Sequence, residues 1–215
     1  MAFDKSIALE LDELEQQVPD SLKELAYHRL EEKIVRLEFP PGIFVTEKAL
    51  ADAIGIGRTP VREAIQRLAT AGLLIVLPRR GIKVSELDAF SVLRLLEVSR
   101  GLDIVMAKAA AIRATRRQRY DFTRLAEEFD TVSTKNDAVR QVKLDSGFNN
   151  LCMLAMGNEH ANKMCRLLQP QTRRFWFAYH GTSGDISLAP RLHGQAARAV
   201  AEGAEEKAVA AFTRI

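Results

Sequence analysis

The sequence is poor in several features that mark particular classes of protein. It has two cysteines, Cys152 and Cys165, which are not in a Cys-x-x-Cys spacing, so we interpret them as core residues in a reducing compartment rather than as a disulfide or a thiolate metal site. No apolar run approaches the roughly 20 residues that cross a bilayer. The N-terminal stretch MAFDKSIALELDELEQQ is acidic and lacks the apolar centre of a signal peptide. We therefore expect a cytoplasmic protein with no membrane partner.

An excess of charge of one sign is also missing. The chain has 31 Lys and Arg residues against 28 Asp and Glu residues, a net charge of +3, which is too small to mark the whole chain as a nucleic-acid binder. No polybasic tail is present, and residues 1–19 are net acidic. Any affinity for DNA must therefore come from basic side chains at particular positions. The length of 215 residues allows one large or two modest domains.

Residues 46–84 predict two short helices and a small hairpin. Thr46 can cap the first helix, and Gly55 and Gly57 end it in a tight turn. We expect the second helix to open on Thr59, with Pro60 at its first position, where a missing N–H is harmless. Its buried face is expected to hold Val61, Ala64, Ile65, Leu68 and Leu73.

Two apolar strands, 74–77 and 82–84, then flank a Pro-Arg-Arg-Gly tip. A helix with a basic first turn suits a DNA major groove, and a basic hairpin beside it suits the minor groove or the backbone. For any single arginine the alternative is simple solvation of an exposed face, but their joint placement on turn, helix and hairpin favours DNA. The predicted DNA-binding residues are Lys48, Arg58, Thr59, Arg62, Arg79, Arg80 and Gly81.

Further positions between Leu30 and Val84 carry a family resemblance. They are Pro41-Gly42, Leu50-Ala51, the run RTPVREAI, Leu68, Gly72-Leu73 and Arg80-Gly81. At these positions, the segment from Leu30 to Val84 resembles the winged-helix domain of the GntR transcription regulators. One departure is Gly57, where the family most often has Ser or Thr; a hydroxyl cap is lost, although the glycine N–H can still face a phosphate.

The remaining sequence predicts helices only. An amphipathic helical extension is expected at 1–19, the DNA-binding domain at 20–85 with Ser21 capping its first helix, and an all-helical domain at 86–215. Ser85 can cap a helix of about 27 residues, which must span a bundle or kink at Gly101. The further helices are expected at 117–134, 137–156, 158–179, 188–202 and 204–215. The predicted fold class is mainly α, a winged helix-turn-helix domain followed by a helical bundle.

The bundle carries a second resemblance. Arg100-Gly101-Leu102-Asp103, LDSGFNNL at 144–151, Gly157-Asn158 and His193 resemble the FCD ligand-binding domain of the FadR-type GntR regulators, and the short length is closer to the VanR-like subgroup. The resemblance implies a zinc or nickel ion held by an Asp, a His four residues later and two later His, with a small organic acid nearby. Asp145 and His193 match two of these ligands, while Asn149 and Ile215 stand where the other two are expected.

The residues themselves leave three alternatives open. Asp145 and Asn149 share one helical face with apolar neighbours, and buried carboxylates are rare unless they are paired or bound to a metal. Asp145 and His193 can hold a metal with Asn149 as a third ligand. They can also form a metal-free pocket in which Arg100 orients an anionic effector, or satisfy one another in a silent core. The predicted effector-binding residues are Arg100, Asp145, Asn149 and His193.

Together these features predict a transcription regulator whose affinity for its operator depends on a small carboxylate effector. A homodimer is expected on an inverted-repeat operator, because one recognition helix covers only a few base pairs. The alternative is a constitutive dimeric DNA-binding protein that senses nothing. An enzyme is not expected, since the sequence shows no nucleophile–base pair, phosphate-binding loop or complete metal site.

Overall fold

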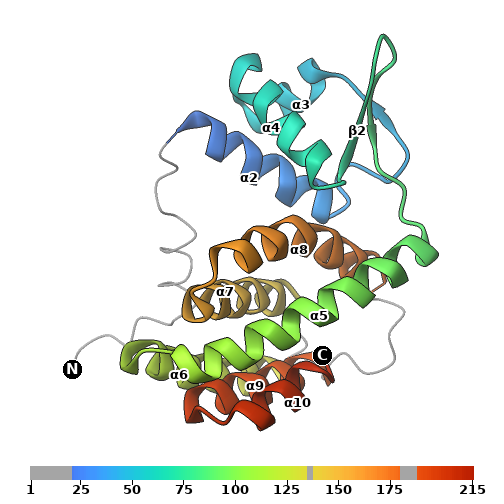
Figure 1. The fold of residues 1–215 in the computed structure, drawn as a ribbon. Helices are drawn as coiled ribbons and strands as arrows, with labels where there is room; N and C mark the ends of the chain where they lie inside the picture. Colours follow the sequence, from blue (N-terminus) through green and yellow to red (C-terminus); the bar gives the residue numbers. More distant parts are fainter. Residues whose placement is uncertain (1–20, 135–137, 180–187) are drawn as a thin grey trace. The chain divides into compact units, whose positions relative to one another are not determined.

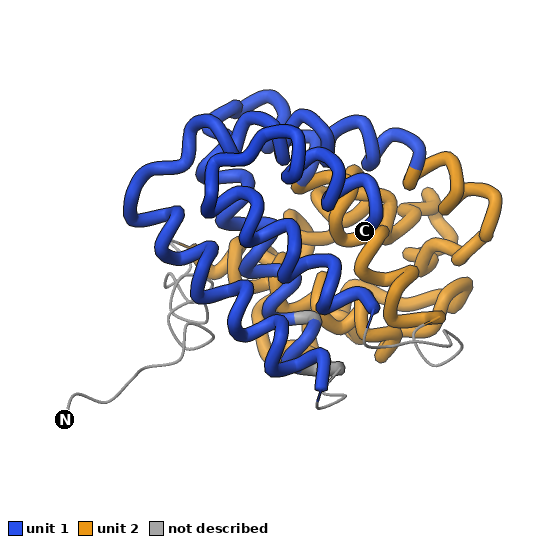
Figure 2. The backbone as a smooth tube through the Cα atoms, turned by 90° about the horizontal axis from the view of Figure 1, so that it is seen from below, with its two compact units in different colours: residues 1–15, 97–165, 183–215 blue, residues 16–96, 166–182 orange. Residues whose placement is uncertain are grey.

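A computed structural model describes residues 21–134, 138–179 and 188–215 (Figure 1). The helical extension predicted for residues 1–19 lies outside this part of the chain. The described residues fall into two compact units (Figure 2). Unit 1 holds residues 97–134, 138–165 and 188–215, and unit 2 holds residues 21–96 and 166–179.

Unit 2 begins with the helices that were expected from their capping residues. Helix α2 is Leu22–Val35, and the Ser21 hydroxyl accepts a hydrogen bond from the Glu24 N–H. Helix α3 is Glu47–Ile54, and the Thr46 hydroxyl accepts from the Ala49 N–H at 3.1 Å. It ends at Gly55, whose φ of 65° lies in the left-handed region that favours glycine. These caps confirm the start of both helices and the turn after α3.

The start of the next helix corrects the sequence prediction. Helix α4 is Arg58–Thr70 and its N-cap is Gly57 in an extended conformation, so Thr59 does not open the helix. Pro60 is the third helical residue rather than the first, and it is tolerated because the first-turn N–H groups have no intrahelical acceptor. The expected buried face is confirmed for Val61, Ala64, Ile65 and Leu68, which are between 0% and 2% exposed. Leu73 is also buried, but it lies after the end of α4 and is not part of that face.

Three antiparallel strands complete the winged helix. Strands β1 (Phe44–Val45), β2 (Leu74–Leu77) and β3 (Gly81–Val84) lie in the order β1-β3-β2. Strand β3 pairs Ile82 with Val76 on one side and with Val45 on the other. The hairpin matches the prediction, whereas β1 was missed because two residues are too few to show a strand period.

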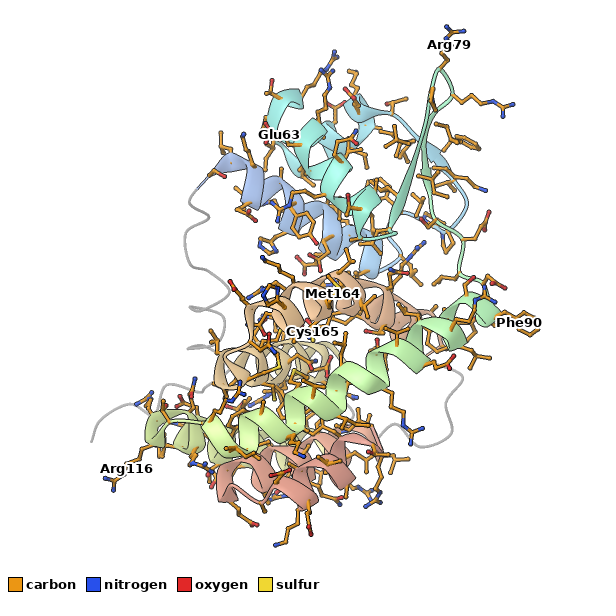
Figure 3. All side chains as sticks on the ribbon, in the orientation of Figure 1. Glu63, Arg79, Phe90, Arg116, Met164 and Cys165 are labelled. Carbon is orange, nitrogen blue, oxygen red and sulfur yellow. The ribbon has the colours of Figure 1, made fainter. Side chains whose placement is uncertain are left out.

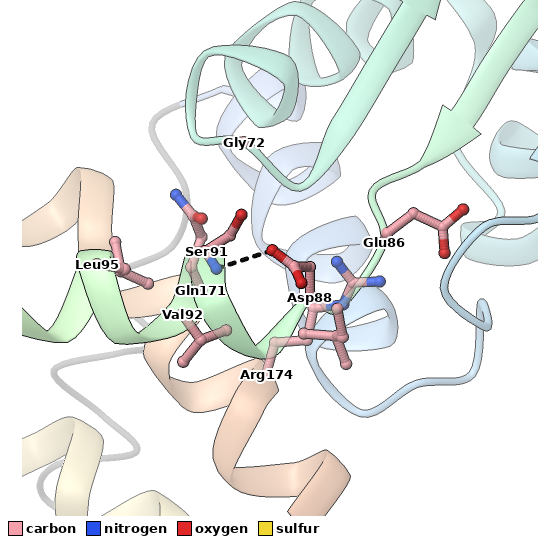
Figure 4. Close-up of a pocket in the computed structure, with 9 residues that line it drawn as sticks. Gly72, Glu86, Asp88, Ser91, Val92, Leu95, Gln171 and Arg174 are labelled. Atoms are coloured by element: carbon pink, nitrogen blue, oxygen red, sulfur yellow. Dashed lines mark hydrogen bonds between the residues drawn. The ribbon is translucent and has the colours of Figure 1, made fainter.

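The segment after the hairpin corrects a second predicted cap. Helix α5 is Ala89–Arg113, and the Asp88 carboxylate accepts a hydrogen bond from the Ser91 N–H at 2.8 Å (Figure 4). Ser85 therefore does not cap α5. Its carbonyl accepts instead from the Arg174 guanidinium at 2.7 Å, in the part of helix α8 (Glu159–Tyr179) that belongs to unit 2.

In the described residues of unit 1, helices and short connections make up the whole structure. It contains the α5 residues from 97 onward, α6 (Arg116–Ser133), α7 (Ala138–Met156), the start of α8, α9 (Leu188–Glu202) and α10 (Glu205–Phe212). All five helices expected after α5 are found within a few residues of their predicted limits. Helix α5 runs through Gly101 as one helix, and its core neighbours include Phe122, Phe129 and Phe148, all 0% or 1% exposed.

Candidate functional site

The predicted DNA-binding residues are all on the surface of unit 2. Arg58 and Thr59 are the first two residues of α4 and both are exposed. Arg58 forms no hydrogen bond or ion pair with the described residues, so its guanidinium is available to a partner. Lys48 on α3 is also exposed, and its ammonium lies 3.6 Å from Asp52 in a solvent-exposed pair, which is weak. The first turn of α4 and the exposed face of α3 therefore each present one cationic side chain to solvent.

Arg62, one turn further along α4, is held by an acid from the preceding helix. Its Nε lies 3.2 Å and 3.3 Å from the two Glu47 carboxylate oxygens, and its Nη2 lies 2.9 Å from one of them. The hydrogen bond from Arg62, and then the charges of Arg62 and Arg58, hold the pKa of Glu47 below its ordinary value. Arg62 is 66% exposed at its side chain, so the pair lies on the surface that carries Arg58.

Arg67 on the same helix contacts α2. Its guanidinium pairs with Glu24 at 2.7 Å and stacks over the Tyr27 ring at 4.1 Å from the ring centre. Both partners belong to α2, so Arg67 holds α4 against α2. Of the cationic residues on α4, Arg58 and Arg62 are therefore the ones open to DNA.

The hairpin tip carries two further exposed arginines. The Arg80 N–H donates to the Leu77 carbonyl at 3.0 Å, which closes a four-residue turn with Pro78 second and Arg79 third. Arg79 has a φ of 62°, a conformation that favours glycine at this place in a turn. Figure 3 shows its side chain at the tip of the hairpin, directed away from the strands. A strained backbone that carries an exposed cation is consistent with a contact made by that cation.

In unit 1, His193 on α9 lies between two hydrogen-bond acceptors. Its Nδ1 is 2.8 Å from the Ala189 carbonyl oxygen, and its Nε2 is 2.7 Å from Oδ1 of Asp145 on α7. Because both ring nitrogens face oxygen atoms, this geometry favours the form of the ring in which both nitrogens donate. Burial lowers the pKa of His193, but the hydrogen bond and charge of Asp145 outweigh it, and the net pKa is raised. The rings of Phe129 and Phe148 pack against the imidazole.

Asn149 and Asp103 complete the cluster around this pair. The Asn149 amide donates to the Asp145 backbone carbonyl at 3.0 Å and to Asp145 Oδ1 at 3.2 Å. Burial, and then the charge of Asp145, raise the pKa of Asp103 on α5 to about 6. Burial and these same carboxylates also raise the pKa of the Cys152 thiol, so it stays protonated. We name Asp103, Asp145, Asn149 and His193 the unit 1 cluster.

Sequence reasoning missed Asp103 as a member of this cluster. The signal was present, since Asp103 lies three residues after Arg100 on the same helix and belongs to the quoted Arg-Gly-Leu-Asp run. Arg100 itself is exposed and forms no ion pair with the described residues. The partner of Asp145 in this part of the chain is therefore His193, and the structure does not join Arg100 to Asp145.

The predicted metal-binding residues Asp145, Asn149 and His193 come together, but their donor atoms do not fit a metal ion. Nε2 of His193 and Nδ2 of Asn149 both face Oδ1 of Asp145. Among the described residues, no group of three or more His, Cys, Asp or Glu side chains is placed to hold a metal. A transition-metal ion needs several such donors in fixed geometry, and these three residues do not supply them.

A small cavity of about 50 Å³ lies in unit 2 (Figure 4). Its lining includes Gly72, Asp88, Ser91, Gln171 and Arg174. The pockets that bind metabolites are typically about 300–1,000 Å³, so this cavity suits a few water molecules.

In the described part of the chain, no helix is both long and apolar enough to cross a membrane.

Comparison with known proteins identifies both parts of the chain. The family "Bacterial regulatory proteins, gntR family" matches residues 22–84, and the FCD domain family matches residues 94–215. The second match alone covers more than half of the chain. Both matches fit the structure, since the first contains the winged helix and the second contains the helices from α6 to α10.

Individual relatives agree with these families. The chain is 36% identical over 87 residues, 40% of its length, to an uncharacterized HTH-type transcriptional regulator in the TAR-I ttuE-ttuC' intergenic region of Agrobacterium vitis. It is 30% identical over 142 residues to the Nta operon transcriptional regulator of Aminobacter aminovorans. The first match spans 51% of the length of the Agrobacterium protein. The second spans 65% of this chain and 66% of the Aminobacter protein.

A solved structure shows the same fold. The E. coli protein McbR/YncC superimposes with a TM-score of 0.77 over 89% of this chain and 91% of that one, at 18% identity. The chain therefore belongs to the GntR family of transcriptional regulators, in the branch that carries an FCD domain.

Proposed function

We propose that this regulator binds an inverted-repeat operator as a homodimer, with Arg58, Thr59 and Arg62 in the major groove. The observation that carries this proposal is the exposed cationic first turn of α4, which follows the Gly55–Gly57 turn. Such a turn places side chains where they reach base edges. Lys48, Arg79, Arg80 and Gly81 then contact the backbone and the neighbouring minor groove.

The inverted repeat follows from the size of one contact. A single recognition helix covers a few base pairs, which is too short a sequence to select one site in a genome. A two-fold axis doubles the contact and makes the two half-sites related by the same symmetry. The expected spacing of the half-sites is about one helical turn of DNA or a multiple of it.

Selection from a library of random DNA duplexes tests this proposal without knowledge of the natural operator. Repeated selection with the full-length protein is expected to enrich a short inverted repeat, bound by two copies of the chain. An enriched site without two-fold symmetry, bound by one copy, would contradict the dimeric arrangement. Failure to enrich any sequence would contradict specific DNA recognition.

The unit 1 cluster supports an effector site as the second part of the proposal. It brings two carboxyl groups, an amide and an imidazole together in a helical core. Polar groups buried in a helical core are costly unless they form hydrogen bonds with one another or with a ligand. We propose that a small organic acid binds beside the cluster and changes the affinity of unit 2 for DNA.

The charges explain how an anion is accepted there. His193 already pairs with Asp145, so this carboxylate does not need Arg100 as its partner. Arg100 lies one helical turn from Asp103 on α5 and has no ion-pair partner among the described residues, so its guanidinium can pair with the carboxylate of the effector. Asp103, with its pKa near 6, can take up a proton and remove its own repulsion. Binding of the acid is therefore expected to strengthen as the pH falls from 7 towards 6.

A thermal-shift screen of small carboxylic acids tests the effector site. An acid that binds the folded protein raises its melting temperature in a saturable way, and Arg100→Ala is expected to abolish the shift. Arg116→Ala, which removes an exposed arginine from α6, is the matched control and keeps the shift. If no acid stabilises the protein, the alternative is favoured, in which the helical domain serves only to hold two DNA-binding units together.

A further inference from the structure

We infer that Glu47 is a specificity-determining positioning residue, which fixes the Arg62 guanidinium so that its outer edge faces the DNA bases. The inference rests on the proposed function, and it assigns a role to an acidic residue on a surface that must meet a polyanion. Glu47 is the first residue of α3, and its carboxylate accepts hydrogen bonds from Nε and Nη2 of Arg62 on α4.

The donors of Arg62 divide into two sets. A guanidinium carries five N–H groups in one plane. The Nε–H and one Nη2–H are directed at Glu47, which leaves one hydrogen on Nη2 and two on Nη1. These remaining donors form the end of the guanidinium, and two of them can approach O6 and N7 of a guanine side by side. Glu47 therefore occupies the inner edge of Arg62 and leaves a bidentate edge free.

Fixing Arg62 before DNA arrives favours the specific contact. A free arginine side chain loses rotamer entropy when it is held in one geometry, at about 0.5–1.5 kcal/mol per ordered side chain. The short Glu47 side chain, 38% exposed, is anchored at the start of a helix and keeps the guanidinium in one place. Arg62 has already lost part of its rotamer entropy in the free protein, through its hydrogen bonds to Glu47. That part is not lost a second time when DNA binds.

Folding stability gives a weaker explanation for the same pair. Arg62 is 66% exposed, and ion pairs at such exposed sites typically add little to the stability of a protein. A carboxylate on the DNA-binding surface also repels phosphates and reduces binding to every sequence. An acid at position 47 is thus a disadvantage for general affinity, and its benefit is expected in discrimination between bases.

The chain offers a matched control on the same helix. Asp52 is 67% exposed, and its ion-pair partner is Lys48 at 3.6 Å, whereas that of Arg62 is Glu47. Replacing either acid by alanine changes the charge of unit 2 by the same amount. An effect of charge alone is therefore shared by Glu47→Ala and Asp52→Ala, while an effect of positioning belongs to Glu47→Ala.

The experiment compares the full-length wild type with Glu47→Ala, Glu47→Gln, Asp52→Ala and Arg62→Ala. The probes are the duplex that wild type selects from a random library, its single-base-pair variants, and a pool of random duplexes. Arg62→Ala locates the base pair that Arg62 reads, where a bidentate contact is worth about 5- to 150-fold in preference. Thermal melting of each variant verifies that it is folded.

Glu47→Ala is expected to lower the preference at that same base pair by about 2- to 12-fold, the equivalent of ordering one side chain, with Glu47→Gln between it and wild type. Both Glu47→Ala and Asp52→Ala are expected to bind the random pool more tightly. An unchanged preference in Glu47→Ala overturns the inference, as does an Arg62→Ala variant with no loss of preference at any base pair. If Glu47→Ala does not fold, Glu47→Gln decides the same question. Failure of wild type to select any sequence contradicts the proposed function itself.

Discussion

Replacing Asp103 by asparagine is expected to stabilise the protein in a manner that depends on pH. Asp103 is partly buried beside Asp145, and burial together with that charge raises its pKa from 3.8 to about 6. The raised pKa means that the ionised carboxylate is less favourable in the folded protein than in the unfolded chain. Asparagine has nearly the same shape and carries no charge, so Asp103→Asn removes this unfavourable contribution.

The size and sign of this change in stability follow from the pKa of Asp103 in the unfolded chain and in the folded protein. Between pH 4 and pH 6 the folded protein holds the Asp103 proton while the unfolded chain has released it, so wild type loses stability as the pH rises through this window. The difference between 3.8 and about 6 corresponds to roughly 3 kcal/mol, an upper limit because solvent reaches part of the side chain. The advantage of Asp103→Asn is therefore close to zero near pH 4 and reaches its full value above pH 7.

Urea unfolding followed by far-ultraviolet circular dichroism, at several pH values from 4.5 to 8, measures this difference. Asp52→Asn serves as the control, because Asp52 is 67% exposed on α3 and far from the unit 1 cluster in sequence. Its difference from wild type is expected to be small at every pH. An advantage of Asp103→Asn that stays constant, or that shrinks as the pH rises, would refute the electrostatic account of the cluster.

Three further predictions concern DNA binding and the dimer that it requires. Arg79→Gly is expected to stabilise the hairpin turn by roughly 1 kcal/mol, because glycine adopts its positive φ without strain, and yet to weaken DNA binding; thermal melting and a DNA titration measure the two effects, and a loss of both would contradict the account of the turn. Lys48→Ala is expected to weaken binding to all sequences alike and to reduce the slope of log affinity against log salt by about one; a change confined to one base pair would show that Lys48 reads sequence. Sedimentation equilibrium is expected to find a dimer at micromolar concentration, and a monomer both with and without the selected DNA would exclude the inverted-repeat arrangement.

The sequence predicted the local structure well, because local structure depends on neighbouring residues. Ser21, Thr46 and Gly55 mark helix ends by hydrogen bonds and dihedral angles that involve only nearby positions. The errors at Thr59 and Ser85 arose where residues two or three positions apart can each act as a cap. The N-cap of α4 is Gly57, which has an extended conformation. At the start of α5 the capping hydrogen bond is accepted by the Asp88 carboxylate.

The contacts that define the sites were less predictable. Glu47 and Arg62 lie on different helices, and their pairing follows from the angle at which the turn sets α3 against α4. Asp103, Asp145 and His193 come from α5, α7 and α9, so packing of the whole bundle is needed to place their charges together. The periodicity of each helix indicates which face is buried, but it does not indicate which neighbour that face meets.

The most direct test of DNA recognition by α4 is a fluorescence-anisotropy titration of the duplex selected by wild type. The double variant Arg58→Ala/Arg62→Ala is compared with Arg116→Ala/Arg117→Ala, which removes the same charge from exposed positions on α6 in unit 1. We expect the α4 variant to lose about 10-fold or more in affinity, since each base contact is worth about 1–3 kcal/mol, and the α6 variant to bind nearly as wild type does. Equal affinity of the α4 variant and wild type for the selected duplex would contradict the assignment of α4 as the recognition helix.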